Sequence, residues 1–349
     1  MRFFDGHCDT IMKVLEGEGD FASGVGMHIT LPGLLRAGSA AQVFAAFVTS
    51  EQKPGQELET TLSLLAEIRT LCAMHPDNLA IATEWQTIAK ASATEGIIAA
   101  ILGVEGAAPL QGDPENLRVL HDAGVRILTV AWGDSPFCGA TFGEGTGLTP
   151  LGRDLIDLCR ELGVVIDVSH VSDAAFWDIM NMVDGPVVAS HSNCRSLCSF
   201  PRNLSDEMIR CLAEHGGVMG INMGSGFLSE EFYVREKVNM DEFFRATKAG
   251  ERTFDEALRD TEAATARIPR PSLDLVALHV KHAIDVGGED CIGLGGDLDG
   301  VASTPIGIDG IQDYPKIVSL LHGAGLSESQ VEKVCFENLA RVFRKVMSG

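Results

Sequence analysis

Short apolar runs alternate with longer amphipathic segments along this chain. The runs are rich in Val, Ile and Ala, which is typical of strands buried in a parallel sheet. Eight such runs can be counted, namely RFFDGHCD near the start and residues 41–48, 96–104, 125–132, 163–169, 185–191, 216–223 and 291–297. Strands that alternate with helical segments predict βαβ units, and eight such units favour an α/β fold of the (β/α)8 TIM-barrel type.

The segments between the runs have the spacing of amphipathic helices. Examples are QELETTLSLLAEIRTLCAMH, GRDLIDLCRELG and SDEMIRCLAEHG. The last of these opens with Ser205 and Asp206 as candidate capping residues and closes on Gly216. These are the usual start and stop signals of a helix.

A longer stretch separates the seventh and eighth runs. Residues 224–290 lie between them, which is more than one helix needs. The charged, helical part at 224–270 predicts an insertion near the C-terminal mouth of the barrel. A functional lid and a plain extra helical pair are equally good interpretations of it. No linker marks a second domain, so residues 1–349 are predicted to form a single barrel domain.

The balance of charges narrows the choice of partners. The chain has 27 Lys and Arg against 49 Asp and Glu, which gives a formal net charge of −22. This charge repels phosphate backbones and anionic lipid surfaces, so no nucleic acid or membrane partner is expected. The start, MRFFDGHCDT, lacks the features of a secretory signal. Nine cysteines scattered through apolar runs fit a reducing compartment, so a cytoplasmic protein is expected.

Residues that commonly bind metals fall where several predicted strands end. His7 and Asp9 stand two residues apart in the first run and project to the same face. Glu105 closes the third run as GVEG, His170 the fifth as DVSH, and His191 the sixth as ASHS. The strands of a barrel all end at the face that carries the active site, so these side chains are expected to converge.

Three imidazoles with two or more carboxylates exceed what one tetrahedral zinc ion and a water require. Two ions therefore fit better. A glutamate can bridge them, and a water between them loses a proton near neutral pH to become the nucleophile. One ion is then held by His7, Asp9 and Glu105. The other is held by Glu105, His170 and His191.

Asp297 closes the eighth run as GGDLDG and is not needed as a ligand. It is free to orient the hydroxide and to carry a proton to the leaving group. A protein that only bound metal would have no need of such a residue, so Asp297 favours catalysis. Imidazole and carboxylate ligands suit zinc, manganese, cobalt or iron, and two zinc ions are the expected cofactors.

Six motifs share their order and spacing with one known family. They are HCD at His7, GVEG at Glu105, DVSH at His170, SHS at His191, PRNLSD at Arg202 and GLGGDLDG at Asp297. The chain resembles the renal (membrane) dipeptidase family in these motifs and in its closing ENLARVFRKV, over residues 3 to 346. The resemblance implies a binuclear zinc dipeptidase on an α/β barrel, with Asp297 as the acid/base and with a homodimer as the expected assembly.

The resemblance also implies that Arg202 binds the carboxylate end of a dipeptide. An Arg offers a planar fork that matches a carboxylate, and Arg202 follows the sixth run in the loop where substrate would lie. Arg195, in HSNCR, is the nearer competitor for the same role.

One segment departs from the family pattern. The characterised mammalian members carry a His after the fourth strand, in a segment like LTHS, which helps to bind and polarise the scissile carbonyl. The corresponding stretch here reads LTVAWGDSPFCGAT, with Trp132 or a neighbour in that place. The oxyanion donor is then the indole N–H of Trp132, Ser135, a backbone amide or a metal ion.

Three functions remain to be compared. The first is a metallodipeptidase that hydrolyses free dipeptides, including those with a D-residue in the second position. The second is a binuclear metal hydrolase of a related amide, lactam or N-acyl amino acid, because the changed fourth-strand loop should reshape the pocket. The third is a barrel that binds metal and a small ligand without turnover, against which Asp297 argues.

Overall fold

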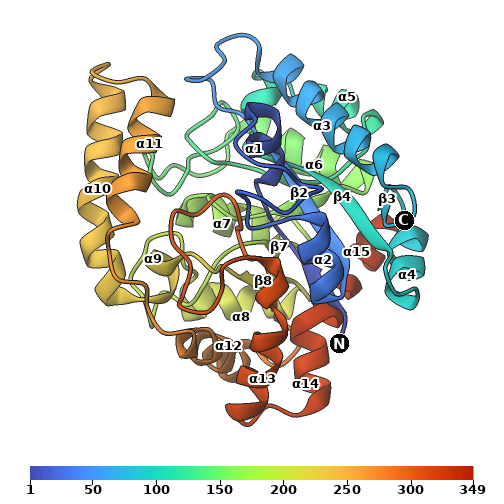
Figure 1. Ribbon diagram of the computed structural model, residues 1–349. Coiled ribbons are helices and arrows are strands. Elements are labelled where there is room, and N and C mark those ends of the chain that lie inside the picture. The colour runs from blue at the N-terminus through green and yellow to red at the C-terminus, as the bar shows by residue number, and fades with distance from the viewer. Residues whose placement is uncertain (349) are drawn as a thin grey trace.

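The protein is described here by a computed structural model that covers residues 1–348. Its centre is a closed barrel of parallel strands in the order β1, β2, β4, β5, β6, β7, β8, β9 and back to β1 (Figure 1). These strands are β1 (Phe3–Asp5), β2 (Ser39–Phe47), β4 (Ile98–Glu105), β5 (Val125–Thr129), β6 (Val165–Asp167), β7 (Val188–Ala189), β8 (Val218–Ile221) and β9 (Ile292–Leu294). Each overlaps one of the predicted apolar runs, which confirms the TIM-barrel prediction.

One strand was not predicted from the apolar runs. β3 (Leu79–Ile81) pairs with the first residues of β4, on the same edge that β5 occupies further along. It extends that edge and adds no member to the closed ring. A strand of 3 residues is too short to show a periodicity, which is why the pattern does not predict it.

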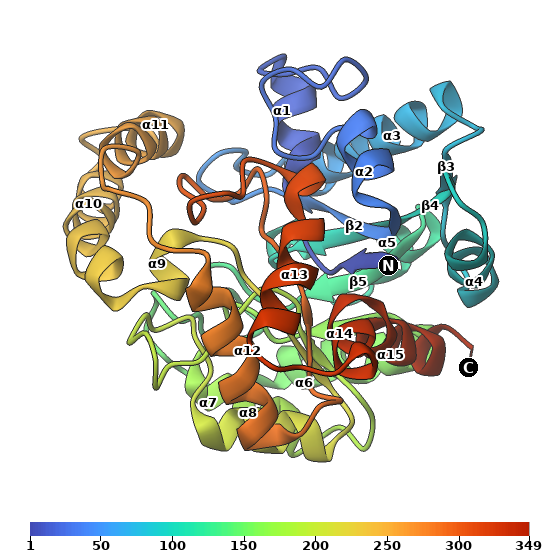
Figure 2. The same cartoon turned by 60° about the horizontal axis from the view of Figure 1, so that its bottom comes forward.

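Helices surround the barrel (Figures 1 and 2). They are α1 (Thr10–Glu16), α2 (Leu31–Ala37), α3 (Glu57–Met74), α4 (Trp85–Ala93), α5 (Asn116–Asp122), α6 (Pro150–Leu162), α7 (Asp173–Met180), α8 (Asp206–Glu214), α9 (Ser225–Leu228), α10 (Glu230–Lys248), α11 (Phe254–Thr265), α12 (Asp274–Gly287), α13 (Pro315–Gly323), α14 (Glu328–Glu332) and α15 (Asn338–Met347). The turns η1 (Ala108–Leu110), η2 (Ile311–Asp313) and η3 (Lys333–Glu337) complete the set. No helix within residues 1–348 has both the length and the apolar character needed to cross a membrane.

The ends of α8 follow from its local sequence. The hydroxyl of Ser205 accepts a hydrogen bond from the backbone N–H of Met208, as its predicted capping role requires. The helix ends at Glu214, and Gly216 follows with a φ of 72°. Glycine adopts this left-handed conformation at little cost, so it stops the helix where the sequence indicated.

Alternation along the strands separates the barrel interior from the side that faces the helices. Ile101 of β4 and Val165 of β6 belong to an apolar layer that also includes Phe343 of α15. Side chains two or four residues further along a strand face the same way. Glu105 and Asp167 therefore stand on the interior side, beyond the apolar layer, at the carboxyl ends of their strands.

The segment after β8 forms the predicted helical insertion. It holds α9, α10 and α11, and α10 and α11 lie to one side of the barrel in both views (Figures 1 and 2). Aromatic contacts join the pair to the barrel mouth. The ring centroid of Phe254 in α11 lies 6.4 Å from that of Phe47 and 5.5 Å from that of Trp132.

Candidate metal centre and substrate cavity

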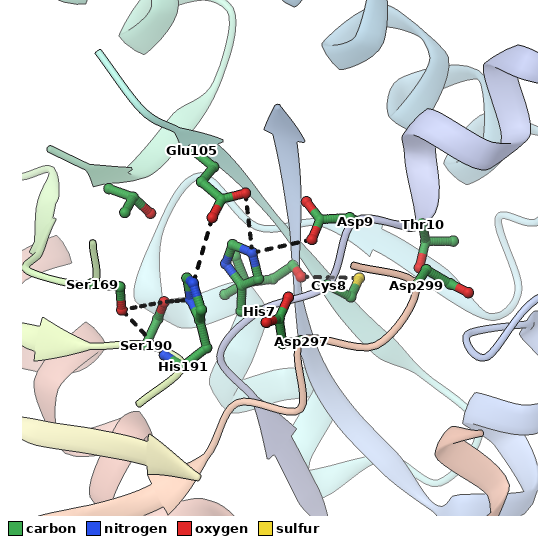
Figure 3. A network of polar contacts seen from close by, with 12 residues as sticks. His7, Cys8, Asp9, Thr10, Glu105, Ser169, Ser190, His191, Asp297 and Asp299 are labelled. Carbon is green, nitrogen blue, oxygen red and sulfur yellow. Dashed lines mark hydrogen bonds and ion pairs between the residues drawn. The ribbon is translucent and has the colours of Figure 1, made fainter. Parts of the chain in front are cut away.

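The five predicted ligands come from the ends of four strands and meet in one place. Figure 3 shows His7, Asp9, Glu105 and His191 together. His7 and Asp9 follow β1, Glu105 is the last residue of β4, and His170 and His191 follow β6 and β7. Three of them are nearly inaccessible to solvent, with 2% of His7, 4% of Glu105 and 1% of His191 exposed, and His170 is partly buried. The structure therefore brings together the residues that the sequence singled out.

Glu105 lies between two groups of ligands. Its Oε1 is 2.8 Å from Nε2 of His170 and 3.4 Å from Nε2 of His191. Its Oε2 is 3.6 Å from Nε2 of His7, which in turn lies 3.5 Å from Oδ2 of Asp9. The carboxylate thus presents one oxygen to each group.

Each group has the composition and spacing of a cation site. The candidate ligand atoms of His7, Asp9 and Glu105 lie within 4.8 Å of one another, and so do those of Glu105, His170 and His191. Among residues 1–348, Nε2 of His7 and Oδ1 of Asp9 are buried without a hydrogen-bond partner. Buried polar atoms are normally paired, so a divalent cation would supply what these two atoms lack. The residues present therefore fit a metal.

Burial prepares the ligands for coordination. It lowers the pKa of His170 to about 4 and that of His191 well below its usual value, so both rings are neutral at pH 7. Burial acts against ionisation of Glu105, but contacts with His7, His170 and His191 hold its pKa well below the usual range. Neutral His170 and His191 beside a charged Glu105 are the protonation states that metal binding requires in that group. At His7 burial acts in the same direction, but the carboxylates of Glu105 and Asp9 outweigh it and raise the pKa above its usual value.

Ser190 and Asp167 support the ligands and were not singled out in the sequence. Ser190 donates from Oγ to Oδ2 of Asp167 at 2.6 Å and lies 2.8 Å from Nδ1 of His191. Its hydroxyl oxygen can then accept the Nδ1–H of His191, which leaves Nε2 free toward Glu105. Their positions in the motifs could have pointed to them. Asp167 stands three residues before His170 in DVSH, and Ser190 stands directly before His191 in ASHS.

Asp297 lies beside the ligands, in the loop after β9 (Figure 3). Its Oδ2 accepts a hydrogen bond from Nδ2 of Asn222 at 2.8 Å, and its backbone N–H donates to the carbonyl of His7 at 3.2 Å. Asp297 and His170 have positive φ angles of 55° and 68°. Such conformations cost non-glycine residues about 1–3 kcal/mol and gather at functional sites.

These residues open into a cavity of about 1140 Å³. Its floor includes four candidate site residues, Asp9, Glu105, His170 and Asp297. Its roof includes side chains of α10 and α11, among them Phe243 and Phe254. The insertion therefore contributes to the cavity wall, and its role as a lid stays a prediction.

The two candidate arginines have different surroundings. Arg202 lines the cavity and is 3% exposed, and its one hydrogen bond, from Nη2 to the carbonyl of His191, is 3.4 Å long. Among the described residues its Nε has no partner, and burial lowers its pKa to about 10. Arg195 instead forms two hydrogen bonds with Asp173, at 2.7 and 2.8 Å, away from the cavity lining. The geometry favours Arg202 as the partner of a substrate carboxylate.

Trp132 lines the same cavity in the loop after β5. Its ring centroid lies 6.1 Å from that of His170 and 5.0 Å from that of Phe47. Ser135 also lines the cavity, but its Oγ accepts the backbone N–H of Phe137 at 3.2 Å. Trp132 thus stands next to a candidate ligand, and its role as an oxyanion donor stays a prediction.

Comparisons with known proteins point in one direction. An uncharacterized protein in the pqqA 5' region of Klebsiella pneumoniae is 28% identical over 301 residues, which are 84% of this chain and 98% of that protein. The solved structure of the dipeptidase AC, a metallopeptidase of family M19, is 25% identical with a TM-score of 0.83 and covers 100% of this chain and 99% of its own. A metallopeptidase from Rhodobacter sphaeroides, liganded with a phosphinate mimic of the dipeptide L-Ala-D-Ala, has a TM-score of 0.80 at 24% identity over 99% of each chain.

The family model of the membrane dipeptidases matches residues 1–348. This match confirms the resemblance seen in the six motifs, and the buried cluster of His, Asp and Glu fits the metal that such peptidases use. Of the three functions compared above, the first is the one that these findings support. The chain belongs to the membrane dipeptidase family, peptidase family M19, and is a metal-dependent dipeptidase.

Proposed function

We propose that the enzyme hydrolyses free dipeptides with two zinc ions, held by two ligand groups that share Glu105. The observation that carries the proposal is the pair of overlapping groups around this carboxylate. His7 and Asp9 complete one group, and His170 and His191 complete the other. When bound, the ions would polarise the scissile carbonyl and supply a nucleophilic water at neutral pH.

Asp297 would hold and move the proton. Burial, reinforced by the nearby carboxylates of Asp9 and Glu105, raises its pKa to about 8. Because the carboxyl group stands beside both ligand groups, it could take a proton from the nucleophilic water and pass it to the amine of the leaving amino acid. Asn222 fixes the carboxyl group by donating to its Oδ2 at 2.8 Å.

Arg202 would orient the substrate by binding its C-terminal carboxylate. The guanidinium is buried in the cavity wall and has unused donors, which a carboxylate would satisfy in a bidentate pair. Trp132 would stand near the scissile carbonyl with its indole N–H as a donor, in the place of the family's His. The dipeptide mimic bound by the Rhodobacter sphaeroides relative supports L-Xaa-D-Xaa dipeptides as substrates here.

A cytoplasmic location and a homodimer belong to the same proposal. The nine cysteines are free thiols and eight of them are buried, as in proteins of a reducing compartment. The homodimer rests on the family resemblance, and light scattering on the purified protein would test it.

The first experiment is elemental analysis of the metal-loaded protein, with hydrolysis of a mixed panel of L,L and L,D dipeptides by the same preparation. We expect two divalent ions per chain and cleavage of at least some members of the panel. A single ion per chain would contradict the shared role of Glu105. Two ions without cleavage of any dipeptide would contradict the proposed substrate and favour a different amide.

A further inference from the structure

One wall of the cavity borders Arg202 and has no role in the function proposed so far. It is built by the loop after β7, the α9 region, α10 and the loop after β5. We call it the aromatic subsite and define it by Phe142, Phe200, Phe227, Glu236, Met240 and Phe244, all of which line the cavity.

The rings of the aromatic subsite form a connected set. The centroids of Phe200 and Phe227 are 4.3 Å apart, and those of Phe142 and Phe200 are 5.8 Å apart. Phe142 also lies 5.3 Å from Phe244 of α10. Aromatic faces carry partial negative charge and attract cations, so a wall of this kind suits a positively charged group as well as an apolar one.

Glu236 places a carboxylate in this apolar wall. It lies on α10, is half-buried, and has no hydrogen bond or ion pair with any other residue in the range 1–348. Burial alone raises its pKa to about 7. A Cβ on Gly226 would lie 1.8 Å from Oε2 of Glu236, so the carboxylate in its present position packs directly against this glycine.

A carboxylate that gives up part of its hydration without a partner raises the free energy of the folded protein. The other acidic residues of α10 differ in this respect. Glu231, Asp241 and Glu242 are paired with Arg235, Lys237 and Arg245 at the surface, and Glu230 accepts hydrogen bonds from Ser199. Glu236 lines the cavity instead, so a positively charged group of a ligand would give it the partner that no other residue in the range 1–348 supplies.

The position of the subsite indicates which part of a dipeptide it would contact. Cζ of Arg202 lies 5.6 Å from the ring centroid of Phe227, so the guanidinium borders the aromatic subsite directly. With the C-terminal carboxylate on Arg202, the side chain nearest to Phe227 and Glu236 is that of the C-terminal residue. The first residue would lie nearer the candidate ligands, beside Trp132, whose ring centroid is 6.1 Å from that of His170.

We propose that the aromatic subsite selects dipeptides whose C-terminal residue has a basic side chain, with Glu236 as the counter-charge. This proposal rests on the function proposed above, because it uses Arg202 as the carboxylate anchor. An ammonium or guanidinium group would approach the ring faces and form a charge-assisted hydrogen bond with the carboxylate. An uncharged side chain of the same length would fill the subsite but leave Glu236 without a partner.

The test compares hydrolysis of Ala-D-Lys and Ala-D-norleucine by the metal-loaded enzyme. The norleucine side chain has the same four carbons as that of Lys but lacks the ε-amine. We expect kcat/KM for Ala-D-Lys to exceed that for Ala-D-norleucine by about ten-fold or more, the value of one hydrogen bond to a charged group. Glu236→Gln should bring the ratio close to one. Glu231→Gln, an exposed change on the same helix, should leave the ratio as in the wild type.

A second readout does not depend on turnover. Calorimetric titration of both dipeptides into the metal-loaded Asp297→Asn variant, with and without Glu236→Gln, should show the same ratio in Kd. Equal kcat/KM and equal Kd for the two dipeptides in the wild-type subsite would overturn the proposal. The same pair of side chains can be placed at the first residue, in Lys-D-Ala and norleucyl-D-Ala. A ten-fold preference for Lys-D-Ala in that pair, with none for Ala-D-Lys, would also overturn the proposal, because the basic side chain would then bind at the other end of the cavity.

The two proposals can fail separately. Cleavage of neutral dipeptides with a ratio unaffected by Glu236→Gln would leave the dipeptidase function standing and reject the subsite. Absence of any cleavage would reject the proposed substrate, while the calorimetric ratio would still decide whether Glu236 binds a cationic side chain.

Discussion

The floor and the roof of the cavity are held together by different kinds of contact. On the floor, ligand side chains follow barrel strands and are tied by hydrogen bonds, such as those from Ser190 and Thr129 to Asp167 at 2.6 Å each. In the roof, contacts between aromatic rings join α10 to α11, and the ring centroids of Phe243 and Phe254 are 5.2 Å apart. The ion pairs of these helices lie at the surface, where each contributes about 1 kcal/mol or less.

This difference suggests that the floor of the cavity determines catalysis and that the roof determines which substrate is selected. A catalytic group must stay within about 0.5 Å of its working position, and directional hydrogen bonds from rigid strands can hold it there. Apolar packing has no such directionality and tolerates exchange of side chains with similar volume. We therefore expect changes in the floor to affect metal binding and turnover, and changes in the roof to affect substrate choice and local stability.

Glu105→Gln should have the largest effect. The amide keeps the shape of the side chain but removes the charge that both ligand groups share, so metal content and dipeptide hydrolysis should fall to background together. Elemental analysis and an activity assay on one preparation would measure this, with circular dichroism to verify folding. A variant that kept two ions per chain would show that Glu105 does not bridge the groups.

Asp297→Asn should leave the metal in place and lower kcat by about 10²-fold or more, because the amide cannot exchange the proton. The change is nearly isosteric, and Asn222 can still hydrogen bond to the oxygen of the new side chain. Metal content is the control in this case. Wild-type turnover in the variant would remove Asp297 from the acid/base role.

Arg202→Met should lower kcat/KM for dipeptides by about 30-fold or more, the cost of losing one partner of a buried charge pair. Metal content should not change. Arg195→Met is the matched control, since Arg195 pairs with Asp173 outside the cavity lining. If the two variants had equal kcat/KM, Arg202 would not be the carboxylate anchor.

Thr253→Ala should have the smallest effect, confined to the roof. Thr253 caps α11 by accepting the N–H of Glu256 at 3.3 Å, and loss of such a cap costs about 1 kcal/mol. Hydrogen exchange of the α11 amides should accelerate, with metal content and turnover of small dipeptides unchanged. Thr261→Ala, in the interior of the same helix, removes no cap and should not accelerate exchange. Loss of metal in the Thr253 variant would show that floor and roof are coupled.

Most of the barrel and its ligands could be predicted because both follow from local pattern. Eight apolar runs mark the ring of strands, and four of them carry the predicted ligands at or near their ends, as Glu105 does in GVEG. Parallel strands of a barrel end at one face, so positions along the chain translate directly into a shared site. β3 was missed because it has only 3 residues and depends on pairing with β4.

Contacts between segments that are distant in the sequence could not be predicted from the hydrophobic pattern or the motifs. The resemblance favoured Arg202 over Arg195, but spacing along the chain does not show that Asp173 of α7 pairs with Arg195 and leaves Arg202 to the cavity. Ser190 and Asp167 belong to the motifs, but only the geometry shows that they orient His191. Glu236 is one acid among several on a charged helix until the fold places it opposite Gly226.

The sequence by itself determined the barrel, the candidate ligand set and the family, because strand periodicity and short motifs are local properties of the chain. The tertiary structure alone decided which charges are paired, which are buried without a partner, and which face the cavity. Those properties depend on desolvation and on distances between atoms from separate segments, and neither can be read from spacing along the chain.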